Sequence, residues 1–383
     1  MPGIMRRFTL KKLFLIAAVS GVSLASEENR KGILQQIQVY GDTHIANVPT
    51  FKGSVRDSSY TTQPVNLNEA TVNYAMFRFL RDENKWRAGL GIHGGYYVRV
   101  NYANEATSNA LLERAHLGFK LFENIWLDAG LFESHIGNEG AIHFDLPTLT
   151  RSLIGDLSPY YQNQIRLGYE SAKLTAKLVF MNGWQRIVGY GPAGGWMFSY
   201  MPFSSLSLNS NSYFGVGSNT ESVRYFHNFW LGYDLTKDLN FKLTLDIGAE
   251  QDQYRANQKA LGFGGFSFIS QYIFNSQWAV SLRLEGYDDR RNIFVRRNLR
   301  LLATPYYESE AAFQVLGTSV GVDFKPVPEL MVRAEVRYLR SFDPFFTTSL
   351  SNSQSNLEKL KLQKDEMILS LSLAGYLWGV PES

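Results

Sequence analysis

Residues 85–102 read KWRAGLGIHGGYYVRVNY, and two chemically different faces alternate along this stretch. The odd positions are mostly polar or glycine: Lys85, Arg87, Gly89, Gly91, His93, Gly95, Tyr97, Arg99 and Asn101. The even positions are mostly apolar: Trp86, Ala88, Leu90, Ile92, Gly94, Tyr96, Val98, Val100 and Tyr102. Because side chains alternate between the two faces of a strand, the pattern predicts one long strand with an apolar and a wet face.

The same alternation recurs along the chain, most clearly in residues 162–170, 240–250, 332–338 and 366–377. Strands of ten or more residues are long for a soluble β-sandwich, whose strands average about 5–6 residues. No stretch supplies about 18 uninterrupted apolar residues, as a membrane-spanning helix would require. Closed barrels are the other structures that satisfy their backbone groups in lipid, so we expect a transmembrane β-barrel.

The N-terminal segment, residues 1–25, has the pattern of a signal peptide. Arg6, Arg7, Lys11 and Lys12 precede a short apolar run, and small residues follow at the expected cleavage position. We therefore expect residues 1–25 to be cleaved, which leaves residues 26–383 as one barrel domain. Of 38 basic and 35 acidic residues, 34 and 35 remain in the mature chain, so its charge gives no support to nucleic-acid binding.

Turn signals set the strand number. Seven short turns are expected near residues 81–84, 122–124, 171–172, 202–205, 236–238, 275–276 and 326–329. Longer connections are expected at residues 47–65, 103–109, 137–159, 183–195, 218–221, 254–260, 290–310 and 343–363. Together they divide the chain into about 16 strands, within a range of roughly 14–18, and an antiparallel barrel follows. Short turns in the periplasm and long external loops place both termini in the periplasm.

The third long connection, residues 137–159, is unusually apolar for an exposed loop and reads GNEGAIHFDLPTLTRSLIGDLSP. Folding it into the barrel would bury its apolar side chains and narrow the pore. Its charged residues would then face arginines that the alternation places on the lumen wall, and opposed charges in a pore sort solutes by charge. The candidate constriction residues are Glu139, Asp145, Arg151 and Asp156 on the loop, and Arg87, Arg99, Arg114, Arg166, Arg224, Arg283, Arg333 and Arg337 on the wall. The competing interpretation is a set of salt bridges that hold the barrel in shape.

The sequence also bears on two other functions, a barrel hydrolase and an adhesin. A barrel hydrolase would need a nucleophile and a histidine on the lipid-facing side, and His227, near Ser222, is the one candidate. Its aromatic neighbours favour a belt at the membrane interface, so we predict no catalytic residue and no enzyme. An adhesin that binds a host or partner protein through residues 47–65, 290–310 or 343–363 is the alternative to transport. The six histidines show no ligand spacing, and the chain has no cysteine, so we predict no metal site and no cofactor.

An ordered series of motifs covers residues 130–185: GLFESHIGNE at 130–139, then Pro147, Arg151-Ser152, SPYY at 158–161, Arg166 and NGWQ at 182–185. This series resembles the OmpL-like putative β-barrel porin family. The resemblance implies an outer-membrane porin that passes small polar solutes or ions. Its expected partners are outer-membrane lipid, the solutes, the barrel-assembly machinery and, as an open question, further copies of the same chain.

Overall fold

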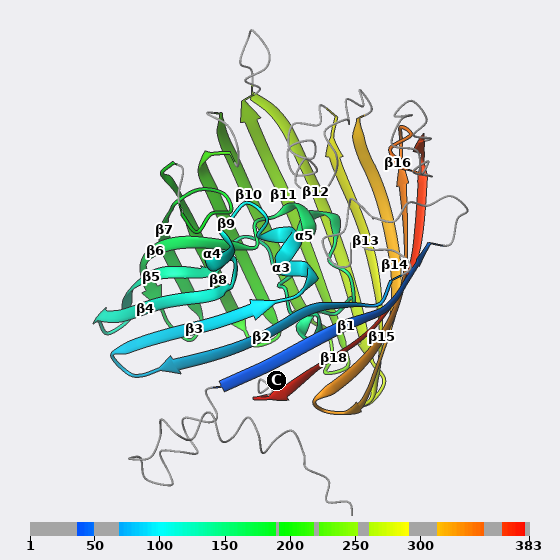
Figure 1. The fold of residues 1–383 in the computed structure, drawn as a ribbon. Coiled ribbons are helices and arrows are strands. Elements are labelled where there is room, and N and C mark those ends of the chain that lie inside the picture. The colour runs from blue at the N-terminus through cyan, green and yellow to red at the C-terminus, as the bar shows by residue number, and fades with distance from the viewer. Residues whose placement is uncertain are drawn as a thin grey trace, which may run out of the picture.

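The computed structural model describes residues 37–49, 69–188, 191–217, 222–251, 260–290, 312–347 and 362–379 (Figure 1). The expected signal peptide, residues 1–25, lies outside these residues. So do most of the connections at residues 47–65, 290–310 and 343–363.

Sixteen strands form one closed barrel, which confirms the predicted fold and strand number (Figure 1). Each strand pairs antiparallel with the next one along the chain, and β1 pairs with β18 to close the circle. The strands are β1 (Ile37–Pro49), β2 (Thr71–Asp82), β3 (Trp86–Gly94), β4 (Leu112–Phe122), β5 (Ile125–Glu133), β6 (Tyr161–Glu170), β7 (Leu174–Met181), β8 (Ala193–Phe203), β9 (Leu206–Val216), β10 (Val223–Asp234), β11 (Leu239–Gln251), β12 (Ala260–Ile273), β13 (Trp278–Asp289), β14 (Phe313–Val327), β15 (Leu330–Ser341) and β18 (Asp365–Trp378). Two further short strands, β16 (Phe346–Thr347) and β17 (Leu362–Gln363), pair only with each other.

The two rims of the barrel differ in the length of their connections. All seven predicted short turns lie at one rim, which we call the short-turn rim. Val39 pairs with Trp378, and Ile37 pairs with Phe79 near the end of β2, so both ends of the wall also lie at this rim. The long connections join strands at the opposite rim.

The alternation of faces holds along the strands, as β11 illustrates. Leu245 and Ile247 point outward and are 41 % and 62 % exposed, whereas Thr244 and Asp246 point inward and are each 3 % exposed. Within the described part of the chain, no second layer covers the outward apolar side chains, because the sheet is closed and its core lies inside. This arrangement suits a wall that faces hydrocarbon.

The second half of residues 85–102 does not form the predicted strand. The strand ends at Gly94, and residues 96–101 form helix α3 (Tyr96–Asn101). Gly95 adopts φ 115°, and a Cβ at this position would lie 2.4 Å from the carbonyl oxygen of Asn73, so only glycine fits the break. After it, Tyr97, Val98 and Tyr102 are buried inside the barrel, where the pattern had predicted outward positions for Val98 and Tyr102.

The remaining helices are also short: α4 (Thr107–Ala110), the 3-10 helix η1 (His143–Asp145) and α5 (Leu153–Leu157). Among the described residues, no helix is long and apolar enough to cross a membrane. Helices α3 and α5 lie within the barrel, between its opposite walls (Figure 1).

Candidate functional site

The connection between β5 and β6, residues 134–160, folds into the barrel, and we call it the inward loop. Its helix α5 contacts β12 and β13 on the far wall, and η1 contacts β18. The apolar side chains that made the sequence unusual are buried there, and the most completely buried are Leu149, Leu153 and Ile154. Burying one such side chain stabilises by about 1.5–3 kcal/mol, which favours the inward position over exposure to water.

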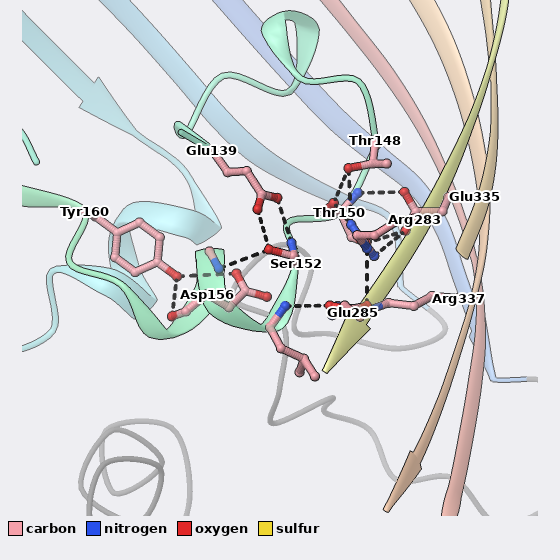
Figure 2. A network of polar contacts seen from close by, with 12 residues as sticks. Glu139, Thr148, Thr150, Ser152, Asp156, Tyr160, Arg283, Glu285, Glu335 and Arg337 are labelled. Atoms are coloured by element: carbon pink, nitrogen blue, oxygen red, sulfur yellow. Dashed lines mark hydrogen bonds and ion pairs between the residues drawn. The ribbon is translucent and has the colours of Figure 1, made fainter. Parts of the chain in front are cut away.

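Two wall glutamates accept hydrogen bonds from the backbone of the inward loop (Figure 2). Glu335 on β15 accepts from the Thr150 N–H at 3.0 Å and also from the Thr150 hydroxyl. Glu285 on β13 accepts from the Leu153 N–H at 2.6 Å. Two of these three bonds come from backbone N–H groups, so they position the loop whatever side chains it carries.

Two wall arginines neutralise these glutamates. Arg283 contacts Glu285 at 3.2 Å and Glu335 at 3.0 Å, and it also donates to the Thr150 carbonyl oxygen at 2.5 Å. Arg337 donates to Glu285 at 2.9 Å (Figure 2). All four charged side chains are at most 3 % exposed, so they anchor the loop to the wall and are shielded from solvent.

The charged residues of the loop serve first to shape the loop itself. Ser152 caps α5 by accepting from the Gly155 N–H at 3.1 Å. Glu139 accepts from the Ser152 N–H at 2.7 Å and from the Ser152 hydroxyl, which ties the start of the loop to its helix. His135 is held by Gln162, and burial lowers the pKa of this imidazole to about 4, so the ring is neutral at physiological pH.

Arg151 and Asp156 both contact Tyr160. The Arg151 guanidinium stacks on the Tyr160 ring at 4.1 Å and donates to the Gly155 carbonyl oxygen at 2.5 Å. The Tyr160 hydroxyl donates to Asp156, at 3.0 Å to the backbone carbonyl oxygen. The structure therefore brings Glu139, Arg151 and Asp156 together in one loop.

Asp145 and Arg333 lie at a second contact between the loop and the wall. Arg333 on β15 donates to Asp323 at 2.7 Å and to the carbonyl oxygen of His143 at 2.5 Å. The Tyr376 hydroxyl on β18 donates to Asp145 at 2.9 Å. These bonds hold η1 beside the strands that close the barrel.

Two of the other predicted wall arginines, Arg87 and Arg224, form ion pairs with lumenal carboxylates. Arg87 contacts Asp128 at 2.5 Å and Glu170 at 2.6 Å, and Arg224 contacts Glu250 at 2.8 Å. These ion pairs support the interpretation that lumenal salt bridges hold the barrel in shape.

Arg99 was misplaced by the sequence pattern. It lies on α3, exposed and stacked on Tyr96 at 4.3 Å, and not on a barrel strand. Arg166 projects inward from β6, stacks on Phe132 at 3.9 Å and donates to the carbonyl oxygen of Glu133 at 3.2 Å. Among the described residues, no carboxylate lies within salt-bridge distance of Arg166.

Several site residues escaped the sequence analysis. Glu113 escaped it, although the adjacent Arg114 was predicted. Both contact the lumenal charge cluster, because a register shift opposite Gly91 and Ile92 interrupts the alternation. Glu113 also binds Arg78 at 2.6 Å. By contrast, Glu285 and Glu335 obey the alternation, so the parity argument that selected Arg283 could have found them.

Two cavities border the inward loop. One of about 560 Å³ lies between the loop residues Phe144–Pro147 and the short-turn rim, and its charged lining residues are Asp145, Asp234, Lys242, Asp323 and Lys325. The other, of about 230 Å³, lies between the loop and the β2–β5 side of the wall, and its charged lining residues are Glu113, Glu133, Glu139 and Arg151. The loop therefore has a cavity with charged lining residues on each of its two sides.

His227, the candidate for a barrel hydrolase, lies on the outer face as expected. Its ring packs against Trp196 and Phe229, with centroids at 5.4 and 3.9 Å. Its nitrogen contacts Ser210 at 3.2 Å, whereas the predicted neighbour Ser222 donates to Glu250 at 2.7 Å. The aromatic surroundings are those of a membrane-interface belt.

Comparisons with known proteins agree with this architecture. The profile of the family described as putative beta-barrel porin-2, OmpL-like, matches residues 37–372. OmpT of Vibrio cholerae is similar in structure, with a TM-score of 0.52, 12 % identity, and coverage of 89 % of this chain and 97 % of that one. The anion-selective porin from Comamonas acidovorans has a TM-score of 0.54, 8 % identity, and coverage of 89 % and 99 %. The outer membrane channel DcaP of Acinetobacter baumannii has a TM-score of 0.54, 12 % identity, and coverage of 89 % and 96 %. No curated protein matches the chain in sequence.

Proposed function

This chain belongs to the putative beta-barrel porin-2, OmpL-like family, and we propose that it is an outer-membrane porin whose water-filled channel is constricted by the inward loop. The channel passes small polar solutes or ions by passive diffusion, without a catalytic step. The observation that carries the proposal is a loop anchored inside a barrel of sixteen strands.

The width of the barrel supports a channel. Barrels of about 16 strands enclose an aqueous lumen, whereas barrels of about 8 strands are filled by side chains. The inward loop leaves β5 and enters β6 but is bound to β12, β13 and β15, so it crosses the lumen to the opposite wall. The two cavities beside it, of about 560 and 230 Å³, are segments of the proposed solute path.

The charges along this path support weak selectivity. In the smaller cavity, Glu113 is balanced by Arg78 and Arg114, while the side chain of Glu133 is 51 % exposed. The larger cavity carries both signs. Because rings of one sign produce strong selectivity and mixed walls do not, we expect the reversal potential of the channel to be small.

We further propose that the short-turn rim faces the periplasm, with both termini of the barrel. The family and the rim asymmetry support this orientation, as in other outer-membrane barrels. Cleavage of residues 1–25 on export, insertion by the barrel-assembly machinery and assembly into a homo-oligomer belong to the same proposal. The alternative function, adhesion through residues 47–65, 290–310 or 343–363, depends on segments that lie mostly outside the described residues.

Single-channel recording in planar bilayers tests the function. Purified, folded protein should produce ohmic conductance steps. In a KCl gradient, Arg166→Glu should shift the reversal potential toward cation selectivity, because it replaces an inward cation that lacks a carboxylate partner among the described residues with an acid.

Arg166→Lys is the matched control and should leave the reversal potential near that of the wild type. If folded protein gives no conductance, the channel does not exist and adhesion becomes the leading function. An unchanged reversal potential in Arg166→Glu would remove this residue from the solute path.

A further inference from the structure

Three metal-ligand side chains meet between the inward loop and the barrel wall. Asp42 and His44 project inward from β1, and His143 approaches them from η1. One potential ligand atom from each lies within 4.8 Å of the other two. Asp42 Oδ2 and His143 Nδ1 are 3.6 Å apart, and the rings of His44 and His143 meet edge to face at 5.2 Å.

His44 is unusual among the buried polar residues. Its side chain is 0 % exposed, and neither ring nitrogen has a hydrogen-bond partner in the part of the chain that the structure describes. A neutral imidazole has one donor and one acceptor, and leaving both unsatisfied in the interior is costly. A buried polar group without a partner therefore needs an explanation, of which a bound ion is one.

Asn73 provides a second, independent observation. This fully buried side chain lies on β2 at the register shift opposite Asp42, and its amide faces the Asp42 carboxylate. Within the described residues, it makes no hydrogen bond of standard geometry. An amide oxygen at this position could complete the coordination sphere of an ion.

We propose that Asp42, His44 and His143 bind one divalent transition-metal ion, with Zn²⁺ as the best match. Two imidazoles and one carboxylate are a common zinc ligand set, whereas Ca²⁺ and Mg²⁺ prefer sites made of oxygen ligands. Tetrahedral zinc keeps its ligand atoms roughly 3.3–3.5 Å apart, given bonds of about 2.0–2.1 Å. The Asp42–His143 separation of 3.6 Å is close to this range, and the ligand atoms of the cluster all lie within 4.8 Å of one another.

The surroundings of the cluster suit a metal site. The Tyr40 hydroxyl donates to Asp42 at 3.0 Å and orients this carboxylate. Arg333 donates to the backbone carbonyl oxygen of His143 at 2.5 Å and holds the loop backbone at this position. Phe144 and Asp145, which follow His143, line the cavity of about 560 Å³, so this cavity comes within one residue of the proposed site.

A metal ion at this site would join the inward loop to β1, at the point where β1 and β18 close the barrel. Asp42 pairs with Ala374 of β18, so the ligands on β1 lie at the seam between the first and last strands. His143 belongs to the loop. One ion would thus link the loop to the seam, on the same side of the barrel as the anchors on β13 and β15. This inference does not depend on the proposed function, because binding is measured without solute transport.

Metal titration of the full mature barrel, untagged and folded in detergent, tests the proposal. After treatment with a chelator and removal of the chelator, ZnCl₂ should bind by calorimetry at about one ion per chain. Co²⁺ should give the intense visible absorption of a tetrahedral site. His44→Gln and His143→Gln should each weaken zinc binding by at least roughly 10- to 100-fold, since even residues that only orient ligands have effects of that size.

His93→Gln is the matched control, because His93 is also buried in the lumen but is bonded to Tyr74 and to the Ala110 carbonyl oxygen. It should bind zinc as the wild type does. Zinc should also raise the melting midpoint of the wild type and of His93→Gln, but not that of His44→Gln. Wild-type protein that binds no stoichiometric zinc, or equal binding by all four proteins, would overturn the proposal.

Discussion

Glu335 shows how a single lumenal residue can organise the site. It is 1 % exposed, accepts hydrogen bonds from the N–H and the hydroxyl of Thr150, and contacts Arg283 at 3.0 Å. A buried carboxylate is tolerated only where an opposite charge and hydrogen bonds replace its hydration. Here the wall provides the charge and the loop provides the hydrogen bonds, so the residue joins the two.

We expect Glu335→Gln to destabilise the folded barrel by about 3 kcal/mol, because removing one partner of a buried ion pair leaves the other charge uncompensated. Glu285 still contacts Arg283, which limits the loss. The measurement is urea unfolding in lipid vesicles, followed by tryptophan fluorescence.

The control is Arg340→Gln, which breaks a contact of 3.0 Å with Asp365 at an exposed site. Exposed pairs contribute little, so its unfolding midpoint should match that of the wild type. Equal effects of the two substitutions would mean that the buried network does not stabilise the barrel.

At the scale of elements, the inward loop combines two kinds of attachment. Its backbone is bonded to wall glutamates, and its helix α5 buries Leu153 and Ile154 among wall residues that include Phe263 and Tyr287. Neither attachment belongs to the strand ladder. The loop can therefore be released while the barrel remains closed.

Leu153→Asp should release the loop. The substitution places a carboxylate in the apolar cluster, where the leucine is 1 % exposed, and an unpaired buried charge destabilises the inward position of the loop. We expect larger and noisier single-channel conductance, with an unchanged β-sheet spectrum in circular dichroism.

Leu153→Met is the control, since it keeps the volume and the apolar character of the side chain. Its conductance should equal that of the wild type. Wild-type conductance in Leu153→Asp would show that the loop does not narrow the channel.

For the whole molecule, the decisive property is the outward face. Strands of 8 to 15 residues expose apolar side chains around a closed sheet, and the inner face carries the ion pairs. A soluble protein would cover such a face with a second layer, but this barrel has its core inside.

Leu245→Arg tests that face. Leu245 points outward from the middle of β11, and arginine at the bilayer midplane costs about 2–4 kcal/mol. The expected result is a lower unfolding midpoint in lipid vesicles. The same change at Leu235, exposed in a turn of the short-turn rim, should cost about 0–1 kcal/mol. Equal losses at both positions would argue that β11 does not contact hydrocarbon.

The sequence alone determined the barrel, its sixteen strands and the inward position of Arg87, Arg283 and Arg333, because strand periodicity and turn residues act over a few neighbouring positions. The apolar composition of residues 137–159 likewise predicted that this loop folds inward. The same local rule failed where the backbone changed its conformation. Gly95 ends β3 before Arg99, and the register shift near Glu113 moves that residue into the lumenal cluster.

Only the tertiary structure decided which charges meet. Glu335 lies far along the chain from Thr150, and His143 is similarly remote from Asp42 and His44. Their contacts depend on the closure of the sheet and on the depth to which the loop enters it. Neither property leaves a periodic signal in the sequence, because contacts across a lumen follow from the geometry of the whole ring and not from the spacing of residues along one strand.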